Sequence, residues 1–179
     1  VKVIFDSDLR TPTNARLFEP GPDGADARVI VVAGQNVLQR NPDATPLLRQ
    51  LLNRGADVIF AQEREGRPDL KAALRELLQR GVTSLLLEGG GELAATFLEA
   101  ELIDRVAWFV APTLIGGAGV PGPLGGTGAA SMDDAVSLPD LEVQVVGADL
   151  LLTGHPDYPV VLVADEPTAH EHRSAQAAE

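Results

Sequence analysis

The chain has 179 residues, a formal net charge of −12, 45% hydrophobic residues and no cysteine. This length suits one domain with a sizeable core, and the acidity argues against a general nucleic-acid binder. The lack of cysteine excludes disulfides, thiol catalysis and cysteine-based zinc sites. Apolar runs stay far below the roughly 20 residues that span a bilayer, and the first residues do not resemble a secretion signal. We therefore expect a cytoplasmic protein without membrane contact.

Short β-branched runs alternate with amphipathic segments from the first residue to Pro112. The runs predict strands at Val1–Phe5, Arg28–Ala33, Asp57–Phe60, Ser84–Leu87 and Val106–Ala111. Apolar residues at helical spacing predict helices around Leu47–Leu52, Leu70–Leu78 and Leu93–Leu98. Continuous apolar strands separated by helices are typical of an α/β fold, with a mainly parallel sheet covered on both faces. Trp108 and Phe109 are predicted to be core residues of their strand.

The pattern changes after Pro112. Leu114–Met132 is rich in glycine and proline and predicts a long loop, a kind of segment that is more often functional than structural. Strands follow at Leu141–Val146, Leu150–Thr153 and Tyr158–Ala164 without strong helices between them, so we expect the sheet to finish with antiparallel strands. The polar, alanine-rich stretch Asp165–Glu179 predicts a flexible tail.

The most informative stretch is the turn Glu88-Gly89-Gly90-Gly91, between a predicted buried strand and an amphipathic helix. A helix N-terminus presents backbone N–H groups that favour an anion, and glycine lets the backbone approach a phosphate closely. The turn matches neither the G-x-G-x-x-G fingerprint nor a P-loop. It therefore predicts a phosphate or dinucleotide site without naming the ligand, and a tight connection with no ligand is the alternative.

Leu85 to Gly117 reads LLLEGGGELAATFLEAELIDRVAWFVAPTLIGG. This run resembles the reductase domain of the bifunctional deaminase/reductase of riboflavin biosynthesis. VIFDSDLRTPTNARLF near the start and DAVSLPDLEVQVVGADLLLTG near the end also resemble that family, in the same order. The resemblance implies a dihydrofolate-reductase-like, three-layer domain over residues 1–164. The family's domain begins upstream of the segment that matches Val1. We therefore expect either that this sequence is part of a longer protein or that assembly with another chain restores the missing part of the sheet.

The resemblance also implies a function. The family uses NADPH to reduce the ribosyl group of 5-amino-6-(5-phosphoribosylamino)uracil, and its members suggest a homodimer. Glu88 would bind substrate, and no catalytic side chain or metal ligand is assigned. The residues that would contact the cofactor are Ser7, Gly90, Gly91, Glu92, Leu93, Ala94, Ala95 and Thr96.

Some features leave alternatives open. The cofactor's 2′-phosphate would want a cation, and Arg10, Arg16, Arg64 and Arg67 are candidates, although each alone is more often a solvated surface residue. The pair His170 and His172 lacks a third strong zinc ligand nearby. A non-catalytic nucleotide-binding or oligomerisation module, and a reductase of the same fold acting on a pterin-like substrate, are the alternative functions.

Overall fold

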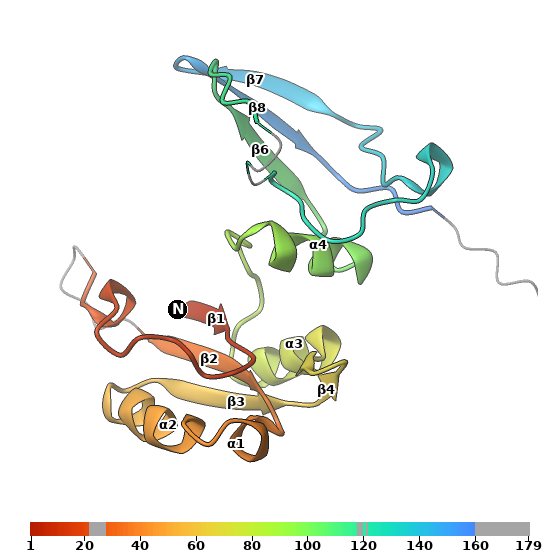
Figure 1. Cartoon of the computed structure of the whole chain (residues 1–179). Helices are drawn as coiled ribbons and strands as arrows, with labels where there is room; N and C mark the ends of the chain where they lie inside the picture. The colour runs from red at the N-terminus through yellow and green to blue at the C-terminus, as the bar shows by residue number, and fades with distance from the viewer. Residues whose placement is uncertain (22–27, 118–119, 121, 160–179) are drawn as a thin grey trace, which may run out of the picture. The chain divides into compact units, whose positions relative to one another are not determined.

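The computed structural model describes residues 1–21, 28–117, 120 and 122–159 (Figure 1). The chain divides into two compact units, Val1–Glu88 and a second unit that begins at Gly89. Among the described residues, no helix is both long and apolar enough to cross a membrane. Whether residues 1–164 act as one domain stays a prediction.

The first unit is built on three parallel strands, β1 (Lys2–Phe5), β2 (Val29–Gly34) and β3 (Asp57–Ala61), in the order β1-β2-β3. Val31 of the central strand pairs with Ile4 on one side and Val58 on the other. Every residue of β2 is buried, as its uninterrupted apolar sequence predicts for a strand covered on both faces.

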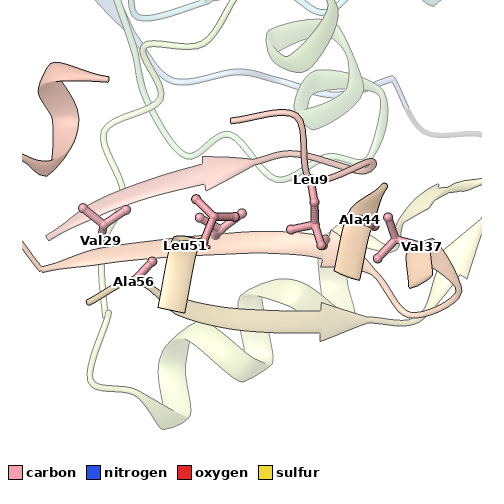
Figure 2. Packing of buried hydrophobic residues seen from close by; sticks show 8 residues of the cluster. Leu9, Val29, Val37, Ala44, Leu51 and Ala56 are labelled. Atoms are coloured by element: carbon pink, nitrogen blue, oxygen red, sulfur yellow. The ribbon is translucent and has the colours of Figure 1, made fainter. Parts of the chain in front are cut away.

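Helices cover both faces of this sheet. α1 (Val37–Arg40) and α2 (Ala44–Asn53) pack on the face that carries Val29 and Val31 (Figure 2). α3 (Leu70–Gln79) packs on the opposite face through Ala73 and Leu77. The side chain of Asp69 caps α3 by accepting a 2.8 Å hydrogen bond from the amide of Ala72. The result is a three-layer arrangement with two apolar clusters, one on each side of β2.

Three small elements of the first unit were not predicted. The 3₁₀ turn η1 spans Arg16–Phe18. A two-stranded antiparallel ribbon, β4 (Glu63–Arg64) and β5 (Arg67–Pro68), follows β3. The four-residue helix α1 is the third.

The second unit holds α4 (Gly91–Glu99), β6 (Val106–Val110), the 3₁₀ turn η2 (Met132–Asp134), β7 (Glu142–Val146) and β8 (Asp149–Gly154). Its strands are antiparallel in the order β6-β8-β7. A tight turn joins β7 to β8, and Gly147 there has a positive φ of 64°. The prediction that the last strands are antiparallel is confirmed, but among the described residues they form a sheet of their own instead of continuing the parallel sheet.

Two predictions about strands are wrong. Ser84–Leu87 forms no strand, and Leu86 is 82% exposed, because no described strand pairs with this segment. Trp108 and Phe109 are in a strand as predicted, but they are 38% and 58% exposed, so the prediction that both are core residues is wrong. Most of the predicted strand Tyr158–Ala164, the predicted tail Asp165–Glu179 and both tail histidines lie outside the described residues.

Candidate functional site

The glycine turn leads into a helix, as predicted. Gly90 is the N-cap of α4 with φ −65° and ψ 166°, and the first intrahelical bond runs from the amide of Ala94 to the carbonyl of Gly90. The amides of Gly91, Glu92 and Leu93 therefore have no intrahelical acceptor. No side chain caps this end of the helix. The first turn of α4 thus offers N–H groups and the positive end of the helix dipole to an anion.

One side of this turn is packed and the other is open. The amide of Gly125 donates a 3.0 Å hydrogen bond to the carbonyl of Gly91. A Cβ placed on Gly91 would lie 3.0 Å from the nitrogen of Gly125 and 3.1 Å from the carbonyl oxygen of Gly122. A Cβ on Gly90 would meet no atom within 4 Å. The glycine–proline loop therefore contacts the start of α4, while Gly90 stays accessible to a ligand.

The remaining residues predicted to line a cofactor follow along α4. Glu92 is exposed, and its Oε1 accepts a 3.4 Å hydrogen bond from the amide of Gly126. Ala95 is only 5% exposed. The hydroxyl of Thr96 donates to the carbonyl of Glu92 at 2.8 Å. Among the residues predicted to contact the cofactor, the most accessible are therefore those at the start of α4, around Gly90.

Glu88 ends the first unit. Its side chain is exposed and makes no hydrogen bond or ion pair with the described part of the chain. A carboxylate that capped its own glycine turn would have such a bond, so the structure does not support that role. Glu88 is available to a ligand.

Ser7 is in a hydrogen-bonded turn at the carboxyl end of β1. The buried carboxylate of Asp6 accepts hydrogen bonds from the amide and the hydroxyl of Thr11, both at 2.6 Å. Leu9 has a positive φ of 54°, which is unfavourable for leucine, and its fully buried side chain offsets that strain. The carbonyl of Ser7 accepts a 3.4 Å hydrogen bond from the amide of Gly34, at the end of β2.

An ion-pair cluster joins the carboxyl ends of these three strands. Arg40 of α1 contacts Glu63 after β3 at 2.7 Å and Asp8 after β1 at 3.3 Å. The Glu63 side chain is only 9% exposed, and its second oxygen accepts a 3.0 Å hydrogen bond from Asn36. The hydrogen bond from Arg40 holds the pKa of Glu63 below its ordinary value and raises the pKa of the Arg40 guanidinium.

Sequence reasoning missed Arg40 and Glu63. They are 23 residues apart, and neither belongs to a recognisable motif. One local signal was present in Gly34, the last residue of a buried strand. A Cβ at Gly34 would overlap Oε1 of Glu63, so the glycine makes room for this carboxylate.

No group of three potential metal ligands occurs within residues 1–21, 28–117 and 122–159. His155 is paired with Asp140 instead. Its amide donates to Oδ1 at 2.8 Å, and its Nδ1 lies 2.6 Å from Oδ2. These contacts hold the pKa of Asp140 below the usual value for an aspartate.

The second unit also has an open depression of about 510 Å³ on one face of its sheet. Polar and charged side chains form most of its lining, and none of them belongs to the glycine turn or α4. The residues that line it are Arg105, Glu142, Val143, Gln144, Leu151 and Thr153.

Comparison with known proteins gives a consistent result. A family model described as "RibD C-terminal domain" matches residues 1–152. The riboflavin biosynthesis protein RibD of Actinobacillus pleuropneumoniae is 34% identical over 161 residues, which cover 90% of this chain and 39% of that protein. The 2,5-diamino-6-ribosylamino-4(3H)-pyrimidinone 5′-phosphate reductase of Methanothermobacter thermautotrophicus is 30% identical over 152 residues, covering 85% of this chain and 64% of that protein.

Solved structures support the fold. RibD of Acinetobacter baumannii superimposes with a TM-score of 0.65 at 24% identity, covering 87% of this chain and 37% of that one. The predicted dihydrofolate-reductase-like α/β fold is confirmed at this level, with parallel strands first and antiparallel strands last. The chain spans less than two-thirds of the length of each of these relatives.

Proposed function

Because this chain belongs to the family of the RibD C-terminal domain, we propose that it is an NADPH-dependent reductase of riboflavin biosynthesis. Its substrate would be 5-amino-6-(5-phosphoribosylamino)uracil, whose ribosyl group is reduced to a ribityl group. The support for this reaction is the similarity of the chain to a riboflavin biosynthesis protein and to a pyrimidinone 5′-phosphate reductase.

The observation that carries the proposal is the first turn of α4. Its free amides and the uncrowded Gly90 suit a phosphate group, and the residues present therefore fit a dinucleotide phosphate. When bound, NADPH supplies the hydride, so the protein needs to bind, orient and exclude water rather than provide a nucleophile. Gly90 and Gly91 would hold phosphate through their backbone.

Ser7 and Glu88 would complete the contacts in this proposal. Ser7 is on a turn fixed by Asp6 and Thr11, which favours a defined contact with the cofactor. The exposed, unpaired carboxylate of Glu88 would accept hydrogen bonds from the substrate. A carboxylate accepts strong hydrogen bonds from N–H and O–H donors, which are abundant on an aminopyrimidine with a ribosyl chain.

The purified protein should oxidise NADPH only when the pyrimidine substrate is present, as followed by the loss of NADPH absorbance. Glu88→Gln should raise the KM for the pyrimidine about tenfold and leave the dissociation constant of NADPH unchanged, because a charge-assisted hydrogen bond is weakened. The exposed Glu19 offers a matched control, since Glu19→Gln removes the same charge without touching the site.

Gly90→Val tests the cofactor contact. The site has room for a side chain and an ordinary φ, so folding should be preserved while access to the amides of α4 is blocked. We expect NADPH binding to weaken about tenfold or more. Ala130→Val, also at an exposed position, is the control. NADPH binding without turnover would instead favour a non-catalytic module, and turnover of a pterin alone would favour the alternative substrate.

We further propose a cytoplasmic homodimer. Apolar side chains on the sheet of the second unit are exposed, including Val143 at 60% and Val145 at 73%, and a second copy could cover them. Light scattering of the purified protein would measure the mass, and a monomer at micromolar concentration would contradict the dimer. Fractionation of the source cells would test the compartment.

A further inference from the structure

The start of α4 is a helix end that no side chain caps. Its N-cap is Gly90, and its first helical residue is Gly91. Glycine loses more conformational freedom on ordering than any other residue, and helix ends fray. A ligand that binds the amides of this turn would have to order two glycines, and that ordering would weaken its binding. A restraint on either glycine should therefore strengthen the binding of an anion here.

A segment of the glycine–proline loop supplies such a restraint. Residues 122–126, the strap, lie against the first turns of α4. The amide of Gly125 donates a 3.0 Å hydrogen bond to the carbonyl of Gly91, and the amide of Gly126 donates a 3.4 Å hydrogen bond to Oε1 of Glu92. A Cβ on Gly90 would meet no atom within 4 Å. The strap therefore fixes the second glycine of the turn and leaves the first one accessible.

The strap can dock only because Gly126 has no side chain. A Cβ on Gly126 would lie 2.9 Å from Cβ of Ala95 and 2.7 Å from Oε1 of Glu99. The exposed Glu99 side chain can move aside, whereas Ala95 is 5% exposed and its Cβ is fixed to the helix backbone. Gly128 has a φ of 70°, close to the 72° of Gly126, but a Cβ there would meet no atom within 4 Å. These two glycines therefore share a backbone conformation and differ in their contact with α4.

Resting on the proposed function, we propose that the strap preorganises the first turn of α4 for the nucleotide, so that strap docking and nucleotide binding strengthen each other. A docked strap orders Gly91 before the ligand arrives. A bound nucleotide in turn holds Gly91 in the conformation on which the strap docks. Thermodynamic linkage makes the two effects equal in free energy. Gly125 and Gly126 act through Gly91, so they are positioning residues.

The first test is a titration of the purified protein with NADPH, followed by the fluorescence of NADPH. Gly126→Ala should raise the dissociation constant about fivefold or more, because the new Cβ lifts the strap off Ala95. Gly128→Ala introduces the same backbone strain without that contact and should change the dissociation constant less than about twofold. Circular dichroism verifies that both variants are folded. Equal weakening by both variants, or no weakening by either, would overturn the proposal.

The second test uses the wild-type protein, so it remains decisive if Gly126→Ala does not fold. Hydrogen exchange of the Gly125 amide, measured by NMR, reports on strap docking because this amide is bonded to Gly91. Saturating NADPH should slow its exchange about fivefold or more. The control is the amide of Asp157, which is bonded to the carbonyl of Ser137 in the same unit and should be unaffected. Unchanged exchange at Gly125, or equal slowing at both amides, would contradict the coupling.

These measurements separate the role of the strap from the proposed function. If the wild-type protein and both glycine variants bind NADPH with the same affinity, the strap has no positioning role and the proposed reductase function still stands. If the wild-type protein does not bind NADPH, the proposed function and the role of the strap are contradicted together.

Discussion

The two units contain sheets of three strands each, but they bury their side chains very differently. All six residues of β2 are buried between helices on both faces. All five residues of β7 are exposed, and four of five in β6 are exposed too. Both sheets have apolar strands, so composition does not distinguish them. The comparison teaches that apolar strands form a core only where helices cover their faces.

Removal of side-chain volume should sharpen this comparison most. Val31→Ala, in β2, should lower the free energy of unfolding by about 2–3 kcal/mol, since two buried carbon atoms are lost and a cavity remains. Val145→Ala, the same change at a 73% exposed position of β7, should cost less than about 0.5 kcal/mol when measured at a concentration low enough to keep the protein monomeric. Urea denaturation followed by circular dichroism gives both values. Equal losses would contradict the difference in burial.

A second pair of substitutions compares glycines. Gly34→Ala should destabilise the first unit by about 1–3 kcal/mol, because the new Cβ overlaps the Glu63 carboxylate and forces it off Arg40. Gly90→Ala, at the N-cap of α4, should cost less than about 1 kcal/mol, because the space there is open and only the N-cap preference for glycine over alanine is lost. Thermal unfolding of both variants would measure the contrast. If Gly34→Ala left the thermal stability unchanged, the Glu63 carboxylate would have to move aside without loss of stability.

The cap of α3 is expected to matter less. Asp69→Ala removes the side-chain acceptor for the amide of Ala72 and should cost about 1 kcal/mol. Asp69→Asn keeps an acceptor oxygen and should restore most of that loss. Hydrogen exchange of the α3 amides would show faster opening at the first turn. An unchanged exchange rate in the alanine variant would rule out a capping role.

The smallest effect should come from pH, in the second unit. The folded-state pKa of Asp140 is below the ordinary value of 3.8, so its contacts with His155 stabilise the unit above that pH. This stabilisation is lost as pH falls through the folded-state pKa. Trp108 is the only tryptophan and is in β6, so its fluorescence reports on this unit during acid titration. Asp140→Asn should flatten the response, and an unchanged acid profile would contradict the assignment.

Periodicity predicted most of the elements correctly. The leucines of α2 and α3 repeat at helical spacing, and β2 reads as a continuous apolar run, so these elements follow from short stretches of sequence. Ser84–Leu87 is also an apolar run, like β2, but it does not form a strand. A strand exists only through hydrogen bonds to a neighbour, and a single segment's sequence does not reveal its neighbour.

The candidate site was predictable to a similar degree. The glycine turn is a contiguous motif, and it lies at the start of α4 as predicted. The three strands of the parallel sheet end at the same edge. This shared edge is what brings together the side chains of Asn36, Arg40 and Glu63. The strand order that creates this cluster has no signature in any one segment, so it emerged from the structure alone.

The contact between Gly91 and the glycine–proline loop has a consequence for sequence evolution. The amide of Gly125 donates a hydrogen bond to the carbonyl of Gly91. A Cβ on Gly125 would lie 2.5 Å from Oε1 of Glu92. Selection should therefore act on the two positions as a pair, although they are far apart along the chain. In a library of random variants that retain the fold, we expect side chains to be accepted at Gly90, rarely at Gly91, and at Gly125 only where the exposed Glu92 side chain moves aside.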